Sequence, residues 1–320
     1  MADVYAGGEP LAEVVRSGFV ESRHSGSVVV LGPDGEVVAW AGDVMGAVFP
    51  RSSNKPLQAV GLLSAGLALG PSDLALVTAS HRGQPFHIQG VLAMLRAAGL
   101  TPSALGCPAD YPLSDEARDA VVRAGGGPEP VLMNCSGKHA GMLRTCVLNG
   151  WPTASYLAPE HPLQRQVSAV FEDLVGESVA AVGIDGCGAP VLSASLRGLA
   201  SAYLRLVSAE PGTPERTVAD AMRAHPEMVS GTDAEGYDTH LMRGVPGLIS
   251  KVGAEGVIAA AAPGIGAVAM KVDDGAARAR LPVLVSALAR LGLGGDVLTR
   301  YTKMPVFGGN REVGEIVAIW

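Results

Sequence analysis

Ser52 and Lys55 are the first side chains in this sequence whose types and spacing suit catalysis. They stand three residues apart in the segment FPRSSNKPLQA, and residues three apart on a helix lie on one face. A serine hydroxyl is a weak nucleophile until a nearby base takes its proton. A lysine amine becomes such a base when burial or a second cation lowers its pKa. The pair therefore predicts serine-based nucleophilic catalysis, with a helix N-cap as the alternative role for Ser52.

Two glycine-rich segments, NCSGKHAG and GIDGCGAP, contain cysteines beside polar side chains. Cys135 and Cys187 are soft donors, and Lys138 or His139 could complete a zinc site with them. Neither segment has the spacing of a CxxC zinc motif, so buried thiols without a metal are the alternative.

Lys271 lies in the otherwise apolar segment AVAMKVDDG, where a strand would direct its amine to one face. An inward amine in apolar surroundings is costly unless it is paired or neutral. The alternative is a lysine that reaches solvent from an edge strand. Ser80, in ASHRGQP, is a second hydroxyl that could lie near that amine, or a simple turn residue.

The pattern along the chain predicts strands near both ends and helices between them. Alternating and apolar runs predict a hairpin over 27–43, a strand pair over 256–262 and 266–272, and short strands near Val306 and Ile316. Helical periodicity is found over 57–67, 87–98, 114–124, 136–148, 161–175, 191–207 and 276–291. We therefore expect an α+β fold in which sheet-forming parts, about 1–55 and 245–320, enclose a helical middle of about 56–244.

The composition excludes several classes of protein. With 320 residues, 48% hydrophobic and 17% charged, the chain has ample apolar surface for a folded core and is not disordered. The net charge of −7 and the absence of a basic cluster argue against a nucleic-acid partner. No apolar run reaches the ~20 residues of a membrane-spanning helix. The four cysteines and the lack of a secretory signal lead us to expect a cytoplasmic protein.

Taken together, these segments resemble the rhizobial-type (class 3) L-asparaginases. The resemblance is carried, in order along the chain, by ESRHSG, FPRSSNKPLQA, ASHRGQP, NCSGKHAGML, GIDGCGAP, KVGAEGV and AMKVDDG. It implies one catalytic unit over 1–320 with a fold like that of serine β-lactamases and glutaminases, a sheet flanked by helices with an inserted helical region. It also implies hydrolysis of the side-chain amide of L-asparagine by a homodimer.

The resemblance further implies roles for particular residues. Two Ser–Lys pairs carry over as Ser52–Lys55 and Ser80–Lys271, and Arg51 and Asp185 fall at substrate-binding positions. The family's zinc ligands, two cysteines and a lysine, match Cys135, Lys138 and Cys187.

Two other functions are compatible with the same residues. A penicillin-recognising serine acyltransferase uses the same S-x-x-K chemistry. A catalytically inactive amino-acid-binding homologue would keep the pocket without turnover.

Overall fold

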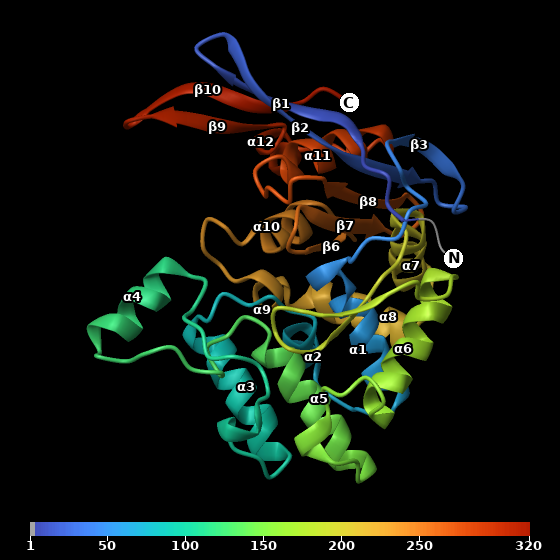
Figure 1. Cartoon of the computed structure of the whole chain (residues 1–320), viewed down its shortest axis with the longest axis vertical. Helices are drawn as coiled ribbons and strands as arrows, with labels where there is room; N and C mark the ends of the chain where they lie inside the picture. Colours follow the sequence, from blue (N-terminus) through green and yellow to red (C-terminus); the bar gives the residue numbers. More distant parts are fainter. Residues whose placement is uncertain (1–3) are drawn as a thin grey trace.

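The computed structural model describes residues 4–320 and contains a large antiparallel sheet above a helical region (Figure 1). The sheet has eight strands in the order β6-β7-β8-β2-β1-β10-β9, and β3 pairs with β2. Its strands are β1 (Glu9–Arg16), β2 (Phe19–Leu31), β3 (Val37–Ala41), β6 (Ile249–Val252), β7 (Val257–Ala262), β8 (Gly266–Val272), β9 (Lys303–Gly308) and β10 (Arg311–Ala318). A separate two-stranded sheet is formed by β4 (Val182–Ile184) and β5 (Pro190–Leu192).

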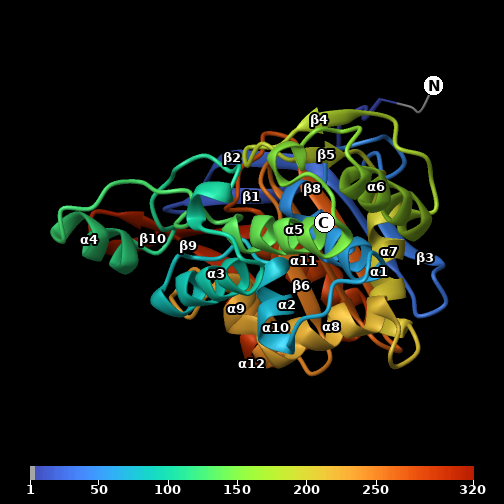
Figure 2. The same ribbon diagram turned by 90° about the horizontal axis from the view of Figure 1, so that it is seen from below.

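Ten helices connect the two groups of strands in the main sheet. They are α1 (Lys55–Ser64), α2 (Pro71–Val77), α3 (Pro85–Ala97), α4 (Asp115–Arg123), α5 (Ser136–Asn149), α6 (Pro162–Val175), α7 (Leu196–Ser208), α8 (Pro214–Ala224), α9 (Pro226–Ser230) and α10 (Tyr237–Gly244). The short 3-10 helices in this region are η1 (Arg51–Asn54), η2 (Pro102–Ala104) and η3 (Thr153–Ser155), and α11 (Arg280–Arg290) and α12 (Asp296–Arg300) follow β8. Within the helical region, α5 packs against α1, α2 and α3 (Figure 2).

The central strands are apolar on both faces because both faces of the sheet are covered. In β2, Val29 and Leu31 join the core shared with the helical region, whereas Val28 and Val30 join the core beneath α11. All six residues of β7, VIAAAA, are buried. A strand buried on both faces needs no polar alternation, which explains the continuous apolar runs in the sequence.

The α+β class and most of the predicted elements are confirmed. The hairpin over 27–43 forms from β2 and β3, and its turn is closed by a hydrogen bond from Gly32 N to Glu36 O. The strand pair β7–β8 also forms as expected. Within residues 4–320, no helix is long and apolar enough to cross a membrane.

The segment 191–207, expected to be one helix, is divided between β5 and α7. The division occurs at Ser195, whose hydroxyl caps α7 by accepting a hydrogen bond from Gly198 N at 2.9 Å. Glu177 holds this cap from outside by accepting from the Ser195 hydroxyl at 3.0 Å. Apolar periodicity alone placed the start of this helix at residue 191, whereas the serine cap sets it at Leu196.

Candidate active site

The segment containing Ser52 and Lys55 folds as a 3-10 helix that continues into α1. Although the two residues stand three apart across this turn, the Lys55 amine is directed to Ala79 O, Ser80 Oγ and Cys135 Sγ. Among the described residues no hydrogen bond joins it to the Ser52 hydroxyl. The Lys55 N–H donates to Ser52 O across this turn. Pro56 lies in the first turn of α1, where its missing N–H costs nothing. Arg51, which begins the turn, has a φ of 51°, a left-handed conformation that is unfavourable for a residue with a Cβ and is often found at functional sites.

Ser80 lies between two lysine amines. Its Oγ is 3.1 Å from Lys55 Nζ and 3.1 Å from Lys251 Nζ. Lys55 also donates to Ala79 O at 2.6 Å and to Cys135 Sγ at 3.1 Å, and Lys251 donates to its neighbour's carbonyl. A hydroxyl can accept a hydrogen bond from one amine and donate its own proton to the other when that one is neutral. The arrangement therefore offers a path for a proton between the two lysines.

Both lysines of this network are buried, and burial perturbs the titration of Lys251. Lys55 is 1% exposed and Lys251 is fully buried. The pKa of Lys251 is lowered from 10.5 to about 8, mainly because the amine is desolvated; the charge of Lys55 acts in the same direction, whereas Asp238 opposes the shift. Near neutral pH this amine can therefore both hold and release a proton.

Lys271 does not reach Ser80. It is half-buried on β8, and its amine donates to the carbonyls of Glu255 at 2.9 Å and Val272 at 3.1 Å. Burial lowers its pKa as well. The expected pairing of Ser80 with Lys271 is thus replaced by a pairing with Lys251.

Strand register explains this difference. Lys251 on β6 pairs with Ala259 on β7, which pairs with Ala269 on β8. Lys271 therefore lies two strands from Lys251 and two residues beyond Ala269, the position on β8 that is in register with it. It lines a pocket with Arg51 and Glu255 instead.

Arg51 and Asp185 are brought together although they are 134 positions apart, one at the start of η1 and the other just after β4. Arg51 Nε donates to Asp185 Oδ1 at 2.8 Å, and both side chains are partly buried. Asp185 lies in a turn that follows β4, where its N–H donates to Ala189 O and its carbonyl accepts from Gly188 N. A guanidinium beside a carboxylate presents the two charges that complement the carboxylate and ammonium groups of a free amino acid.

The two glycine-rich segments also meet, and they bring the predicted metal ligands together. Lys138 Nζ lies 3.2 Å from Cys187 Sγ. The interaction between the Cys135 and Cys187 thiols lowers the pKa of Cys187 and raises that of Cys135, and the charge of Lys138 further favours the Cys187 thiolate. Next to them, His139 Nδ1 is bonded to the Tyr156 hydroxyl at 2.6 Å, while its buried Nε2 has no partner among the described residues.

This donor set fits a zinc ion only if the lysine takes part. Zinc accepts thiolate sulfurs and an amine as donors, but the pKa of Lys138 is raised by Cys187 and Cys135 against the effect of burial, so this amine would have to give up its proton to bind the metal. In the part of the chain that the structure describes, no group of three or more His, Cys, Asp or Glu residues is placed to hold a metal. Lys138 would therefore have to be the third ligand.

The family model for L-asparaginase II matches residues 12–318, which is nearly the whole chain. The chain belongs to the L-asparaginase II family. It is therefore an amidohydrolase, and the resemblance drawn from the sequence is confirmed. No curated protein sequence matches it significantly.

Solved structures that resemble this L-asparaginase II family member do so distantly. A protein called Mglu in its native form has 13% identity and a TM-score of 0.43, with 89% of this chain and 66% of that chain covered, just under two thirds of its length. A Bacillus glutaminase has 14% identity and a TM-score of 0.42, with 78% and 83% covered. A β-lactamase from Mycobacterium bovis has 12% identity and a TM-score of 0.39, with 84% and 95% covered. Likenesses this distant carry no argument about activity.

No role could be assigned from the sequence alone to two residues of this amidohydrolase's site, Lys251 and Asp238. Lys251 lies in the KVGAEGV segment, and Asp238 in GYDTHLMRG. Lysine is scarce in the chain, with only five residues, and a lysine inside the apolar run LISKV was a signal that could have indicated Lys251. No local pattern distinguishes Asp238, because its partners come from a different element.

Proposed function

We propose that this amidohydrolase converts L-asparagine to L-aspartate and ammonia, with Ser52 as the nucleophile and Lys55 as its base. The proposal takes Ser52 from the resemblance and is supported by the Lys55–Ser80–Lys251 network, in which both amines lie 3.1 Å from Ser80 Oγ. It requires the Lys55 amine to turn from Ser80 to Ser52 when the substrate binds. Both serines are half-buried. Ser80 is hydrogen-bonded to two amines, whereas no hydrogen bond of the Ser52 hydroxyl is found among the described residues. Ser52 is thus the hydroxyl that is free to meet a substrate.

In the proposed reaction, Ser52 Oγ attacks the side-chain amide carbon while Lys55 accepts the hydroxyl proton. Collapse of the tetrahedral intermediate breaks the C–N bond, and the leaving nitrogen takes a proton from the Lys55–Ser80–Lys251 network to depart as ammonia. An aspartyl ester on Ser52 remains. Water then attacks the ester, giving its proton to the neutral amine of the network and releasing aspartate.

Arg51 and Asp185 supply the selectivity for an amino acid in this proposal. Asp185 accepts hydrogen bonds from the α-ammonium group, and Arg51 donates hydrogen bonds to the α-carboxylate. When the substrate binds, these two ion pairs replace the ion pair between Arg51 and Asp185. Lys271 adds positive charge to the pocket that it lines with Arg51. It acts on substrate binding in this account, whereas Lys251 takes the relay role expected of Lys271.

Cys135, Lys138 and Cys187 are the residues that would hold a zinc ion. When bound there, zinc supplies a positive charge that can polarise a substrate oxygen. This candidate zinc site lies next to the Ser–Lys network, because the Lys55 amine contacts Cys135 Sγ. The resemblance also implies a homodimer, and light scattering on purified protein tests the assembly.

Ammonia release from L-asparagine, with L-glutamine alongside, tests the proposed activity. The protein is purified without chelator, and Lys303→Ala, which alters an exposed lysine paired with Glu315, is the matched control. We expect release from asparagine in the wild type and the control, and a large loss in Lys55→Met.

Other results would favour the other two functions. Stable acylation by a β-lactam without ammonia release would indicate a penicillin-recognising acyltransferase. Tight binding of asparagine without turnover would indicate a non-catalytic binding protein.

A further inference from the structure

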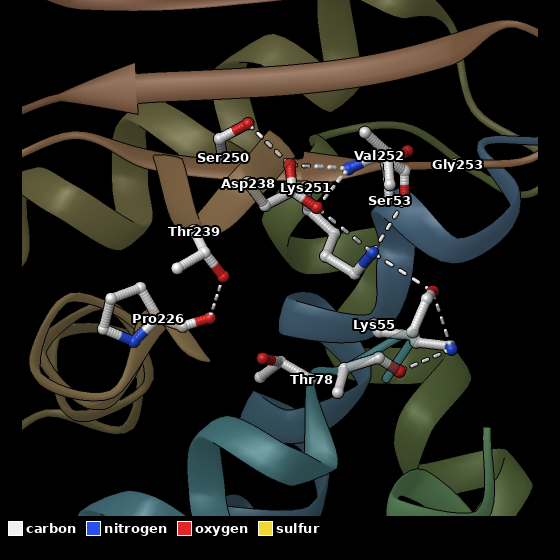
Figure 3. A network of polar contacts seen from close by, with 12 residues as sticks. Ser53, Lys55, Thr78, Pro226, Asp238, Thr239, Ser250, Lys251, Val252 and Gly253 are labelled. Atoms are coloured by element: carbon white, nitrogen blue, oxygen red, sulfur yellow. Dashed lines mark hydrogen bonds and ion pairs between the residues drawn. The ribbon is translucent and has the colours of Figure 1, made fainter. Parts of the chain in front are cut away.

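A buried carboxylate lies against the Lys251 amine. Asp238 Oδ2 is 3.6 Å from Lys251 Nζ, and neither side chain has any exposed surface. The same carboxylate accepts from Ser250 Oγ at 2.8 Å and from Val252 N at 3.1 Å, so it is fixed by two donors on the strand that carries the lysine (Figure 3). Asp238 comes from α10, which packs beside β6.

The edge of the sheet explains how Asp238 is placed. β6 is the last strand on its side, so N–H groups on its outer edge have no neighbouring strand to pair with. Asp238 accepts the Val252 N–H on that edge. The same carboxylate thereby pairs one N–H of the edge strand and places a negative charge beside Lys251, the lysine that contacts Ser80.

The charges around Lys251 require a counter-charge at this position. The titratable and charged groups that act on it are Asp238, Lys55, Cys135 and Arg280. Two of these are basic and one is a thiol, so Asp238 is the carboxylate among them. Without it, a fully buried ammonium would face two other basic groups, an arrangement that strongly favours loss of its proton.

We propose that Asp238 is a positioning residue whose carboxylate keeps the Lys251 amine charged and directs it at the Ser80 hydroxyl. The inference rests on the proposed function for the role of Lys251 in turnover. The ion pair itself is tested without any substrate.

The first test measures the titration of Lys251 directly. The chain has five lysines, so protein labelled with ¹³C at lysine Cε gives five side-chain NMR signals, and the one missing in Lys251→Met identifies the signal of Lys251. In Asp238→Asn, which keeps the shape and one acceptor oxygen, the titration midpoint should fall by about one pH unit or more. Thr239→Val is the control, since Thr239 bonds to Pro226 O rather than to the lysine, and it should leave the midpoint unchanged. An unchanged midpoint in Asp238→Asn would overturn the proposal.

The second test follows kcat/KM for asparagine against pH. The proposed reaction needs Lys251 charged, so activity should fall as pH rises through the Lys251 midpoint, and this alkaline limb should move to lower pH in Asp238→Asn. Asp238→Glu retains the charge, so its alkaline limb of kcat/KM should lie close to that of the wild type. This variant can also be compared with the wild type if Asp238→Asn does not fold. An equal loss at every pH, with the NMR midpoint unmoved, would mean that Asp238 only holds the strand and would overturn the proposal. If the wild type does not hydrolyse asparagine, the proposed function fails while the NMR result still decides the role of Asp238.

Discussion

The Lys251 amine lies 3.1 Å from the Ser80 hydroxyl, although the two residues are 171 positions apart in the chain. Ser80 follows α2 in the helical region, and Lys251 lies on the edge strand β6 of the main sheet. The contact is therefore made where the two parts of the fold meet. Lys55 reaches the same hydroxyl from α1, so the network joins α1, the segment after α2 and the strand β6.

Replacing Lys251 should therefore damage turnover more than replacing Lys271. Lys251→Met removes the amine that contacts Ser80 and should lower kcat by about a hundredfold to ten-thousandfold, the range for loss of a general acid or base. Lys271→Met should act mainly on KM, because that amine lines the pocket and contacts backbone carbonyls. Steady-state kinetics on the two variants makes the comparison. A larger loss of kcat in Lys271→Met would return the relay role to Lys271.

The ion pair of Arg51 with Asp185 should control substrate affinity. Asp185→Asn removes the negative charge that we assign to the α-ammonium group and should raise KM for asparagine by about tenfold or more, with a smaller change in kcat. Arg51→Lys should behave similarly, since a lysine cannot reproduce the guanidinium geometry. The check is inhibition by L-aspartate against succinate, which lacks the amino group. If Asp185→Asn weakens both inhibitors equally, Asp185 does not recognise the ammonium group.

The outline of the fold and the identity of the polar segments were predictable from local signals. Turn residues mark the β2–β3 hairpin, and apolar periodicity marks helices such as α5 and α6. The choice between Lys251 and Lys271 was not predictable in this way, because both stand in apolar runs. Only strand order and register decide which of them faces Ser80.

The meeting of Arg51 with Asp185 has a similar explanation. The pair is 134 positions apart, and its formation depends on a turn after β4 that returns to the start of η1. The resemblance named both residues, but no local pattern showed that they touch. Asp238 could not be predicted as a site residue, because its importance comes from its contacts with Val252 and Lys251 on the edge strand β6.

Zinc should bind at the two thiols and the lysine. Protein purified without chelator should contain about one zinc per chain by elemental analysis, and Cys135→Ala or Cys187→Ala should lower this content. Cys146→Ala is a suitable control, since Cys146 is a buried cysteine on α5 outside the cluster. Zinc content that is equally low in wild type and variants would remove the metal from the account.

Burial of Lys251 should make stability rise with pH. The pKa of this lysine is about 8 in the folded chain against 10.5 for an unburied lysine, so the unfolded chain binds more protons between these values. The free energy of unfolding should therefore increase through this window, by about 1.5 kcal/mol between pH 8 and 9.5 from this group. Urea unfolding of wild type and Lys251→Met at both pH values measures it. The free energy of unfolding of the wild type should rise relative to that of Lys251→Met between the two pH values. An unchanged difference in unfolding free energy would contradict the assignment.

The most direct test of the mechanism is to find the residue that carries the acyl group. Enzyme mixed with L-asparagine is quenched in acid within milliseconds, and its intact mass and peptide masses are measured. We expect one aspartyl group esterified to Ser52, absent in Ser52→Ala and still formed, more slowly, in Ser80→Ala. An ester on Ser80, or one that persists in Ser52→Ala, would contradict the mechanism.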